Sequence, residues 1–181
     1  MASKKKFLSV RFLLSAAAAL LALVAIFLMF APAAVCELIP ETSLTKAQTV
    51  NYTGIQLTFG YTETTTVPVI GTEVKTEIFK FSFANFLPYI LLAAGIAFSV
   101  LTAFGKLGKI SPIVAAACLV VAGVLFFLAP DMCVPASDNK ELVKSLKDSL
   151  SLASGAIVAG VLSVIAALLA LVPLFLKKGK R

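Results

Sequence analysis

The sequence contains no histidine, no tryptophan and only three cysteines among 181 residues. Without histidine, Ser-His triads, Cys-His dyads and most zinc sites are excluded. Charged residues make up 14% of the chain and hydrophobic residues 60%, whereas soluble domains have about 25% charged and roughly 45–50% apolar residues. The composition therefore indicates a membrane protein with little catalytic chemistry.

Charge is also absent from four long stretches, 12–35, 86–104, 110–129 and 150–176. A helix needs about 20 residues to cross a hydrocarbon core roughly 30 Å thick, so each stretch is long enough. Backbone polar groups in lipid must bond within the protein, which favours helices. We therefore expect a membrane all-α fold: one integral membrane domain, 1–181, with a four-helix transmembrane bundle and a small extracellular β-rich cap.

The distribution of charge predicts the orientation of these spans. The N-terminal segment, the short link 105–109 and the C-terminal tail carry ten Lys and Arg residues and no acid. The loops 36–85 and 131–149 carry the other six Lys and all nine acids, so the net charge of +7 divides into +10 and −3. Because cytoplasmic loops are enriched in Lys and Arg, both termini are predicted to be cytoplasmic and both long loops to lie outside. The basic residues are explained by the membrane, so no nucleic-acid partner is expected.

The N-terminal segment has alternative interpretations. Lys4–Lys6, the apolar run and Ala31-Pro32-Ala33 together suggest a secretory signal with a small-residue cleavage site. The stretch 33–36, which ends in Cys36, weakly resembles a lipoprotein cleavage site. Cleavage would leave three spans, and the sequence leaves this alternative open.

The first outer loop, 36–85, is long enough to have structure of its own. Apolar and polar residues alternate at 55–62 and again at 79–83, as in half-buried strands, and 67–71 is a candidate turn or edge strand. The apolar positions either cover the bundle or form a partner surface that recruits another chain by strand addition. They are Ile55, Leu57, Phe59, Tyr61, Phe79, Phe81 and Phe83.

The second outer loop, 131–149, is predicted to be helical. Asp138 and Glu141 have the spacing of a capping box, and Leu142, Leu146 and Leu150 share one helical face. The fourth span is therefore expected to begin outside the membrane as one long helix.

Two cysteines fall near the outer ends of the first and third spans. Cys36 and Cys133 would form a disulfide if their Cα atoms lie within about 7 Å, and otherwise they are small apolar residues. Cys118 lies within a span and is expected to be a packing residue. No Cys-x-x-Cys pair is present, which argues against a thiol oxidoreductase.

The spans contain no ionisable residue of the kind used in proton relays or ion-coupled transport. They contain small residues spaced four apart, which let helices approach closely within one bundle or between copies. These helix-packing candidates are Gly95 with Ser99, Gly155 with Ala159, and Ala156 with Gly160.

Four spans, cytoplasmic termini, a β-rich first outer loop and a short inner turn resemble the claudin-like architecture, and less closely the tetraspanins. Claudins are expected to carry a tryptophan and two cysteines in the first outer loop, where this chain has only Cys36. The resemblance is one of topology and implies no functional residue. The Lys- and Ala-rich composition is also similar to that of small bacterial membrane proteins.

The leading hypothesis is a non-enzymatic membrane protein without a cofactor, whose outer β-rich loop mediates assembly, adhesion or envelope organisation. An alternative is an accessory subunit of a larger transporter, secretion or envelope complex, and a third is a small pore or lipid-facing transporter. The expected partners are the lipid bilayer and either a second copy of the chain or another membrane protein.

Overall fold

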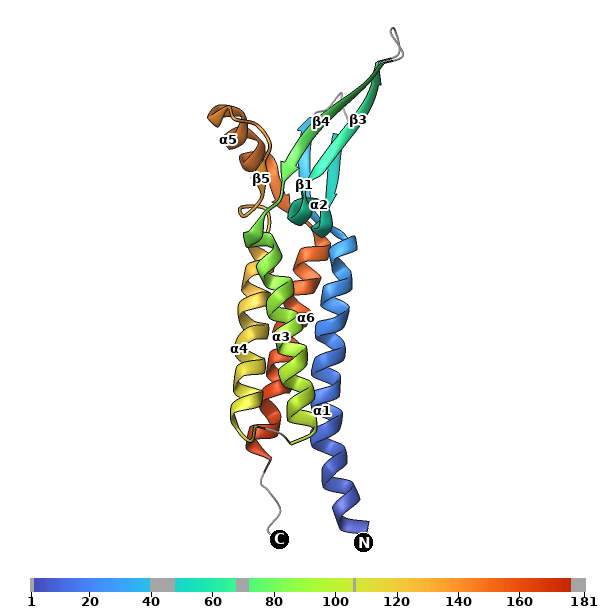
Figure 1. Cartoon of the computed structure of the whole chain (residues 1–181), viewed down its shortest axis with the longest axis vertical. Coiled ribbons are helices and arrows are strands. Elements are labelled where there is room, and N and C mark those ends of the chain that lie inside the picture. Colours follow the sequence, from blue (N-terminus) through green and yellow to red (C-terminus); the bar gives the residue numbers. More distant parts are fainter. Residues whose placement is uncertain (1, 40–47, 68–71, 106, 177–181) are drawn as a thin grey trace. The chain divides into compact units, whose positions relative to one another are not determined.

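The computed structural model describes residues 2–39, 48–67, 72–105 and 107–176. The chain divides into two compact units (Figure 1). The helical unit comprises Met1–Phe27, Leu87–Phe126 and Val158–Arg181. The β-rich unit comprises Leu28–Phe86 and Phe127–Ile157.

Four helices are long and apolar enough to cross a membrane, in agreement with the four predicted spans. They are α1 (Ala2–Phe27), α3 (Phe83–Ala103), α4 (Ile110–Phe127) and α6 (Ser154–Phe175). The predicted first span, 12–35, continues too far, because a 3-10 turn η1 (Leu28–Phe30) follows α1 and strand β1 (Pro32–Ile39) comes next. Pro32 has no N–H group for a helical hydrogen bond, so the helix ends before it.

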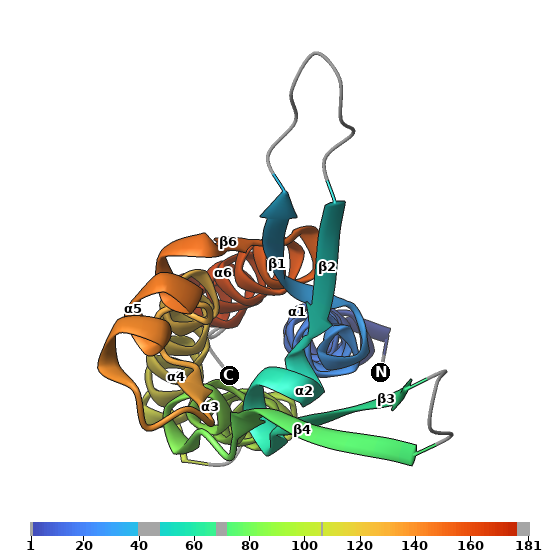
Figure 2. The same cartoon turned by 90° about the horizontal axis from the view of Figure 1, so that it is seen from above.

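Within the helical unit, sequential helices are antiparallel neighbours, and Figure 2 shows the order α1, α3, α4, α6 around the bundle. The rings of Phe12 and Phe104 join α1 to α3 at a centroid distance of 6.4 Å. The rings of Tyr89 and Phe126 join α3 to α4 at 5.3 Å. The Arg11 guanidinium donates a hydrogen bond to the carbonyl after the last turn of α6, where a cation is favoured by the helix dipole.

The β-rich unit contains two three-stranded antiparallel sheets. The first has the order β2-β1-β6, and the second has the order β3-β4-β5. Two short helices, α2 and α5, complete the unit. The bounds of the remaining elements are β2 Gln48–Thr53, α2 Gly54–Phe59, β3 Tyr61–Val67, β4 Thr72–Lys80, β5 Val134–Pro135, α5 Lys140–Ser149 and β6 Leu150–Leu152.

The alternating segment from Ile55 to Phe59 forms α2, so the predicted strand is wrong there. Thr53 and Gln56 form a capping box that starts this helix: the Gln56 side chain accepts from the Thr53 N–H at 2.8 Å, and Thr53 Oγ1 accepts from the Gln56 N–H at 3.4 Å. Gly60 ends α2 with a φ of +96°, and a Cβ there would lie 2.8 Å from a backbone oxygen of β4. The capping box thus determines a helix here, although the alternation of apolar and polar residues favours a strand.

The strand predicted through Phe79, Phe81 and Phe83 is confirmed only for Phe79, because β4 ends at Lys80 and Phe83 begins α3. The Ser82 N–H donates to the Thr58 carbonyl at 2.8 Å, so this connection is paired with α2 instead of a neighbouring strand. The candidate turn at 67–71 lies outside the described residues except for Val67, which is the last residue of β3.

The second long loop is helical as predicted, but two details differ. The N-cap is Asn139 and not Asp138, since the Asn139 side chain accepts from the Glu141 N–H at 3.0 Å. The helix is also not continuous with the fourth span, because Leu150 lies in β6 opposite Cys36 of β1. Leu150 there gains sheet hydrogen bonds and is buried, whereas Leu142 remains 59% exposed on α5.

Candidate ligand pocket in the β-rich unit

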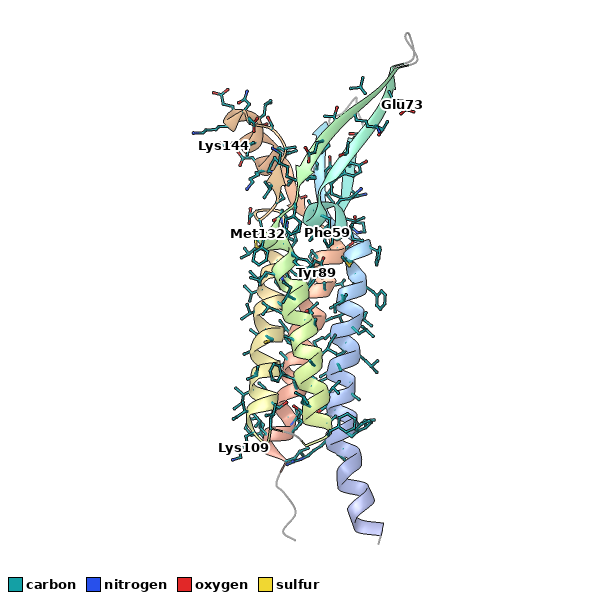
Figure 3. The ribbon with its side chains drawn as sticks, in the orientation of Figure 1. Phe59, Glu73, Tyr89, Lys109, Met132 and Lys144 are labelled. Atoms are coloured by element: carbon teal, nitrogen blue, oxygen red, sulfur yellow. The ribbon has the colours of Figure 1, made fainter. Side chains whose placement is uncertain are left out.

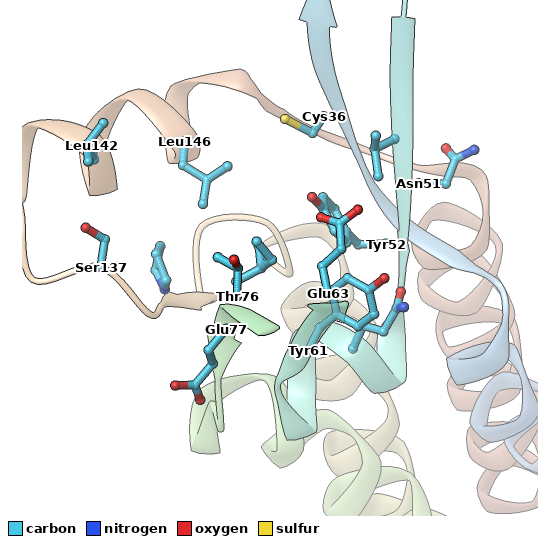
Figure 4. Close-up of a pocket in the computed structure, with 14 residues that line it drawn as sticks. Cys36, Asn51, Tyr52, Tyr61, Glu63, Thr76, Glu77, Ser137, Leu142 and Leu146 are labelled. Atoms are coloured by element: carbon cyan, nitrogen blue, oxygen red, sulfur yellow. The ribbon is translucent and has the colours of Figure 1, made fainter. Parts of the chain in front are cut away.

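A cavity of about 460 Å³ lies entirely within the β-rich unit (Figure 4). Both sheets, α2 and α5 contribute side chains to it, so its lining comes from parts of the chain that are distant in the sequence. The lining residues are Cys36, Val50, Asn51, Tyr52, Gln56, Tyr61, Glu63, Thr76, Glu77, Ile78, Pro135, Ser137, Leu142 and Leu146.

An aromatic cluster forms one wall of this pocket. The Tyr52 ring is perpendicular to Phe79 at a centroid distance of 4.9 Å and contacts Tyr61 edge-on at 6.0 Å. Tyr52 is 7% exposed and Phe79 is fully buried, so packing holds the rings in place. Such edge-to-face pairs contribute roughly 0.5–1.5 kcal/mol beyond the area they bury.

Burial raises the pKa of the Tyr52 hydroxyl, and the negative charges available at Cys36, Glu63 and Tyr61 raise it further. The hydroxyl is therefore neutral at physiological pH and keeps its proton for donation. In Figure 4 the carboxylate of Glu63 lies beside Tyr52. The pocket thus places a neutral phenol and a carboxylate close together.

The charge of the pocket wall has one sign. Glu63 and Glu77 are the acidic residues of the lining, and no Lys or Arg of the described residues belongs to it. Figure 4 shows that the two carboxylates point in different directions, with Glu63 toward the tyrosines and Glu77 away from them. Glu63 is therefore the carboxylate that faces the aromatic wall.

The remaining wall is largely apolar and comes from α5 and the strands beside it. Leu142 and Leu146 lie one turn apart on α5, and both line the pocket. Val50 of β2 and Ile78 of β4 extend this apolar surface. The pocket therefore combines an apolar surface with the carboxylate of Glu63 and the phenols of Tyr52 and Tyr61. These groups suit an organic cation with a hydrocarbon stem.

The predicted partner surface is divided by the structure. Leu57 and Phe79 are fully buried in the core of the β-rich unit, so including them in a contact surface was wrong. Ile55 is half-buried, and Tyr61 lines the pocket. The other three members, Phe59, Phe81 and Phe83, are 51%, 51% and 63% exposed.

The exposed phenylalanines form a second aromatic group. Phe59 and Phe81 lie 6.2 Å apart, and Phe86 lies 5.6 Å from Phe59 and 6.2 Å from Phe81. Figure 3 shows Phe59 at the end of the β-rich unit opposite to Glu73, which lies near the tip of the β3–β4 hairpin. Phe83 and Phe86 lie in the first turn of α3, so this group adjoins the start of a helix that is long and apolar enough to cross a membrane.

Cys36 and Cys133 are brought into one apolar cluster but are not bonded to each other. Cys36 and Cys133 are both buried and free, so the disulfide considered from the sequence is not formed. Cys36 Sγ instead lies 3.4 Å from the Ser149 hydroxyl. Burial raises the pKa of the Cys133 thiol, with a lowering effect from Lys147 and a further raising effect from Asp131. Cys118 is half-buried in α4.

Gly95 of α3, a predicted packing residue, and Gly123 of α4, which is outside the predicted set, both lie close to a neighbouring helix. A Cβ added at Gly95 would lie 2.6 Å from Leu119 Cδ2, and one added at Gly123 would lie 3.1 Å from the Gly160 carbonyl oxygen. Ser99 is buried, and its hydroxyl has no hydrogen-bond partner among the described residues. Small side chains at these positions therefore set the spacing of α3, α4 and α6.

The other members of the predicted packing set have mixed roles. Ala159 is buried and its carbonyl accepts from Ser163 at 2.7 Å. Ala156 belongs to the apolar cluster of the β-rich unit. Gly155 faces the start of β1 and not another helix, since an added Cβ would meet the Pro32 carbonyl and the Ala31 side chain. The prediction of helix packing is therefore wrong for Gly155.

Sequence reasoning missed the pocket residues Tyr52, Glu63, Thr76 and Leu146 as a group. Glu63 has a recognisable signal, because it lies two residues after Tyr61 on the same face of a Thr-rich strand. No local pattern predicts that α5 supplies the opposite wall, because this depends on the pairing of β6 with β1.

The chain matches no protein-family model, no curated protein and no solved structure.

Proposed function

We propose that this chain is a non-enzymatic, multi-pass protein of the cell membrane that uses its β-rich unit, outside the membrane, to bind a partner protein. Assembly, adhesion and envelope organisation are the roles that such a contact would serve. The topology is claudin-like in this proposal, with four spans and both termini cytoplasmic.

The exposure of the β3–β4 hairpin carries this proposal. Residues 62–64 and 73–77 are all exposed, so both faces of the distal ribbon are open to solvent. A two-stranded ribbon is only marginally stable in water unless something covers a face. Val74, with 46% of its surface exposed, is an apolar residue on this ribbon. A partner that covers the ribbon would bury Val74 and stabilise the hairpin.

The charge pattern supports the orientation. Within the helical unit, Lys109 and Tyr89 lie at opposite ends (Figure 3). The end that carries Lys109 also carries Arg11, which bonds to the carbonyl of Leu176. Basic residues gathered at one end of a bundle favour the cytoplasmic side for that end.

The orientation is tested with single cysteines in a variant whose native cysteines are replaced by alanine. We expect Thr64→Cys to react with a membrane-impermeant maleimide in intact cells and Lys109→Cys to react only after permeabilisation. The reverse pattern would place the β-rich unit inside and contradict this part of the proposal.

Partner binding is tested by extraction of the native protein in a mild detergent, followed by sizing and mass identification of what accompanies it. Val74→Glu should remove at least nine-tenths of the accompanying protein. Val134→Glu is the matched control, since Val134 is a comparably exposed strand residue in β5, and it should retain the partner. A monomer without a partner, or equal retention by both variants, would contradict the proposal.

An accessory-subunit role is the second candidate, and the exposed group Phe59, Phe81 and Phe83 favours it. Exposed aromatics next to a span suit lateral contact with another membrane protein as well as lipid. A defined foreign protein in the extract would support this candidate, whereas a homogeneous self-oligomer would support assembly from copies of this chain.

A further inference from the structure

We propose that the pocket of the β-rich unit receives the ammonium group of a lysine side chain presented by the partner protein. This inference rests on the proposed function, and it adds the chemistry by which the partner is recognised.

The size of the pocket fits a ligand. Its volume of about 460 Å³ lies within the range of roughly 300–1,000 Å³ found for ligand sites. A single lysine side chain would not fill such a cavity, so neighbouring residues of the partner enter with it. Asn51, Gln56, Thr76 and Ser137 provide hydrogen-bonding groups for the backbone of such a segment.

The charge of the lining selects a cation. Glu63 faces the aromatic wall, and the described lining contains no basic side chain to neutralise it. An anionic ligand would be repelled, and an apolar ligand would remove water from Glu63 without replacing its hydrogen bonds. An ammonium group beside Glu63 instead supplies both an opposite charge and donors.

The uncharged surfaces of the pocket match the rest of a lysine side chain. Tyr52 and Tyr61 form an edge-to-face pair, and tyrosine rings attract cations within about 6 Å of their centroids. Leu142 and Leu146 offer an apolar surface for the methylene groups. Phe79 holds Tyr52 from behind, so little ordering of the wall is needed when the ligand enters.

The position of the pocket in the unit favours a protein-borne amine over a free one. Glu63, Thr76 and Glu77 line the pocket and also belong to the exposed hairpin of the proposed contact surface. A partner that covers the hairpin would therefore reach the pocket with the same segment. This continuity is the reason for assigning the ammonium group to a lysine of the partner.

The experiment measures peptide binding to the purified full-length protein in detergent micelles by isothermal titration calorimetry. The probes are the blocked peptide Gly-Leu-Lys-Leu-Gly, the same peptide with norleucine in place of lysine, and n-butylamine. We expect the lysine peptide to bind at least tenfold more tightly than either other probe. Glu63→Gln should weaken its binding at least tenfold, because the residue keeps its shape and loses its charge.

Glu73→Gln is the matched control, since Glu73 is an exposed acid on the same hairpin outside the pocket lining, and it should change binding less than twofold. Circular dichroism of both variants would verify their folding. The inference is overturned if the lysine peptide does not bind at millimolar concentration, if the norleucine peptide binds equally well, or if both Gln variants behave alike. Equal binding of n-butylamine would overturn the assignment to a partner protein.

Partner retention in the native extract separates the two proposals. A partner lost in Val74→Glu but kept in Glu63→Gln would support the proposed function and overturn the pocket assignment. A protein that binds the lysine peptide but extracts without any partner would contradict the proposed function while leaving the chemistry of the pocket supported.

Discussion

The ring of Tyr52 meets the ring of Phe79 at 89°, with 4.9 Å between their centroids. Tyr52 belongs to β2 of one sheet and Phe79 to β4 of the other, so this pair joins the two sheets of the β-rich unit. Tyr52 also lines the pocket, and Phe79 packs against it. This contact therefore contributes both to the stability of the unit and to the shape of the pocket.

Phe79→Ala is expected to lower the free energy of unfolding by about 4 kcal/mol, because truncating a buried phenylalanine removes apolar contacts and leaves a cavity. Phe81→Ala is the matched control, since Phe81 is 51% exposed, and it should cost less than about 1 kcal/mol. Urea unfolding in micelles, followed by tyrosine fluorescence, measures both. Equal costs would show that Phe79 is not part of a packed core.

Alkaline pH should destabilise the β-rich unit through Tyr52. Its pKa is raised above 10.0 in the folded state, mainly by burial, so the unfolded chain loses this proton first. The resulting stability is fully present below about pH 10 and is lost as pH rises through the folded-state pKa. Tyr52→Phe should remove this part of the pH dependence, and difference titration of tyrosinate absorbance against that variant reports the Tyr52 ionisation directly. If the tyrosinate signal that is absent from the Tyr52→Phe variant titrated with the pKa of a free tyrosine, the hydroxyl of Tyr52 would not be buried.

Gly95→Val should destabilise the helical unit by about 2 kcal/mol, because the added Cβ would lie 2.6 Å from Leu119 Cδ2. Ala97→Val, at an exposed position of the same helix, is expected to cost less than about 1 kcal/mol. Combining Gly95→Val with Leu119→Ala should recover part of the loss, since the smaller side chain makes room. Thermal unfolding in micelles checks these three variants and Leu119→Ala alone, and additive effects in the double variant would contradict this contact.

The thiols of Cys36 and Cys133 should be inaccessible in the folded protein and free when it is unfolded. Both are buried, and burial raises the pKa of the Cys133 thiol, which lowers the thiolate fraction available for reaction. In a Cys118→Ala variant, a maleimide should therefore label neither thiol under native conditions and both in dodecyl sulfate without reductant. Labelling that requires a reductant would instead reveal a disulfide between them.

The helical spans could be predicted from the sequence because their cause is local. Uncharged stretches of sufficient length must satisfy their backbone hydrogen bonds internally, so four helices follow directly from composition. Gly95 and Gly160 were recognisable for the same reason, since each has a second small residue four positions away on its own helix, and this spacing favours close helix contacts. The capping box of Thr53 and Gln56 is also a local signal. It was overlooked because the alternating residues from Ile55 onward predicted a strand in the same place.

What the tertiary structure decided depends on contacts between distant segments. Leu150 would continue α5 by its local pattern, but pairing with Cys36 of β1 places it in a strand. Phe79 and Phe81 have the same residue type and lie two positions apart, yet only Phe79 enters the core, because β4 ends at Lys80. The sequence by itself thus determined four apolar helices and a polar segment with its own structure. The pocket required the fold, because Tyr52, Glu63 and Leu146 come from three elements that only long-range strand pairing brings together.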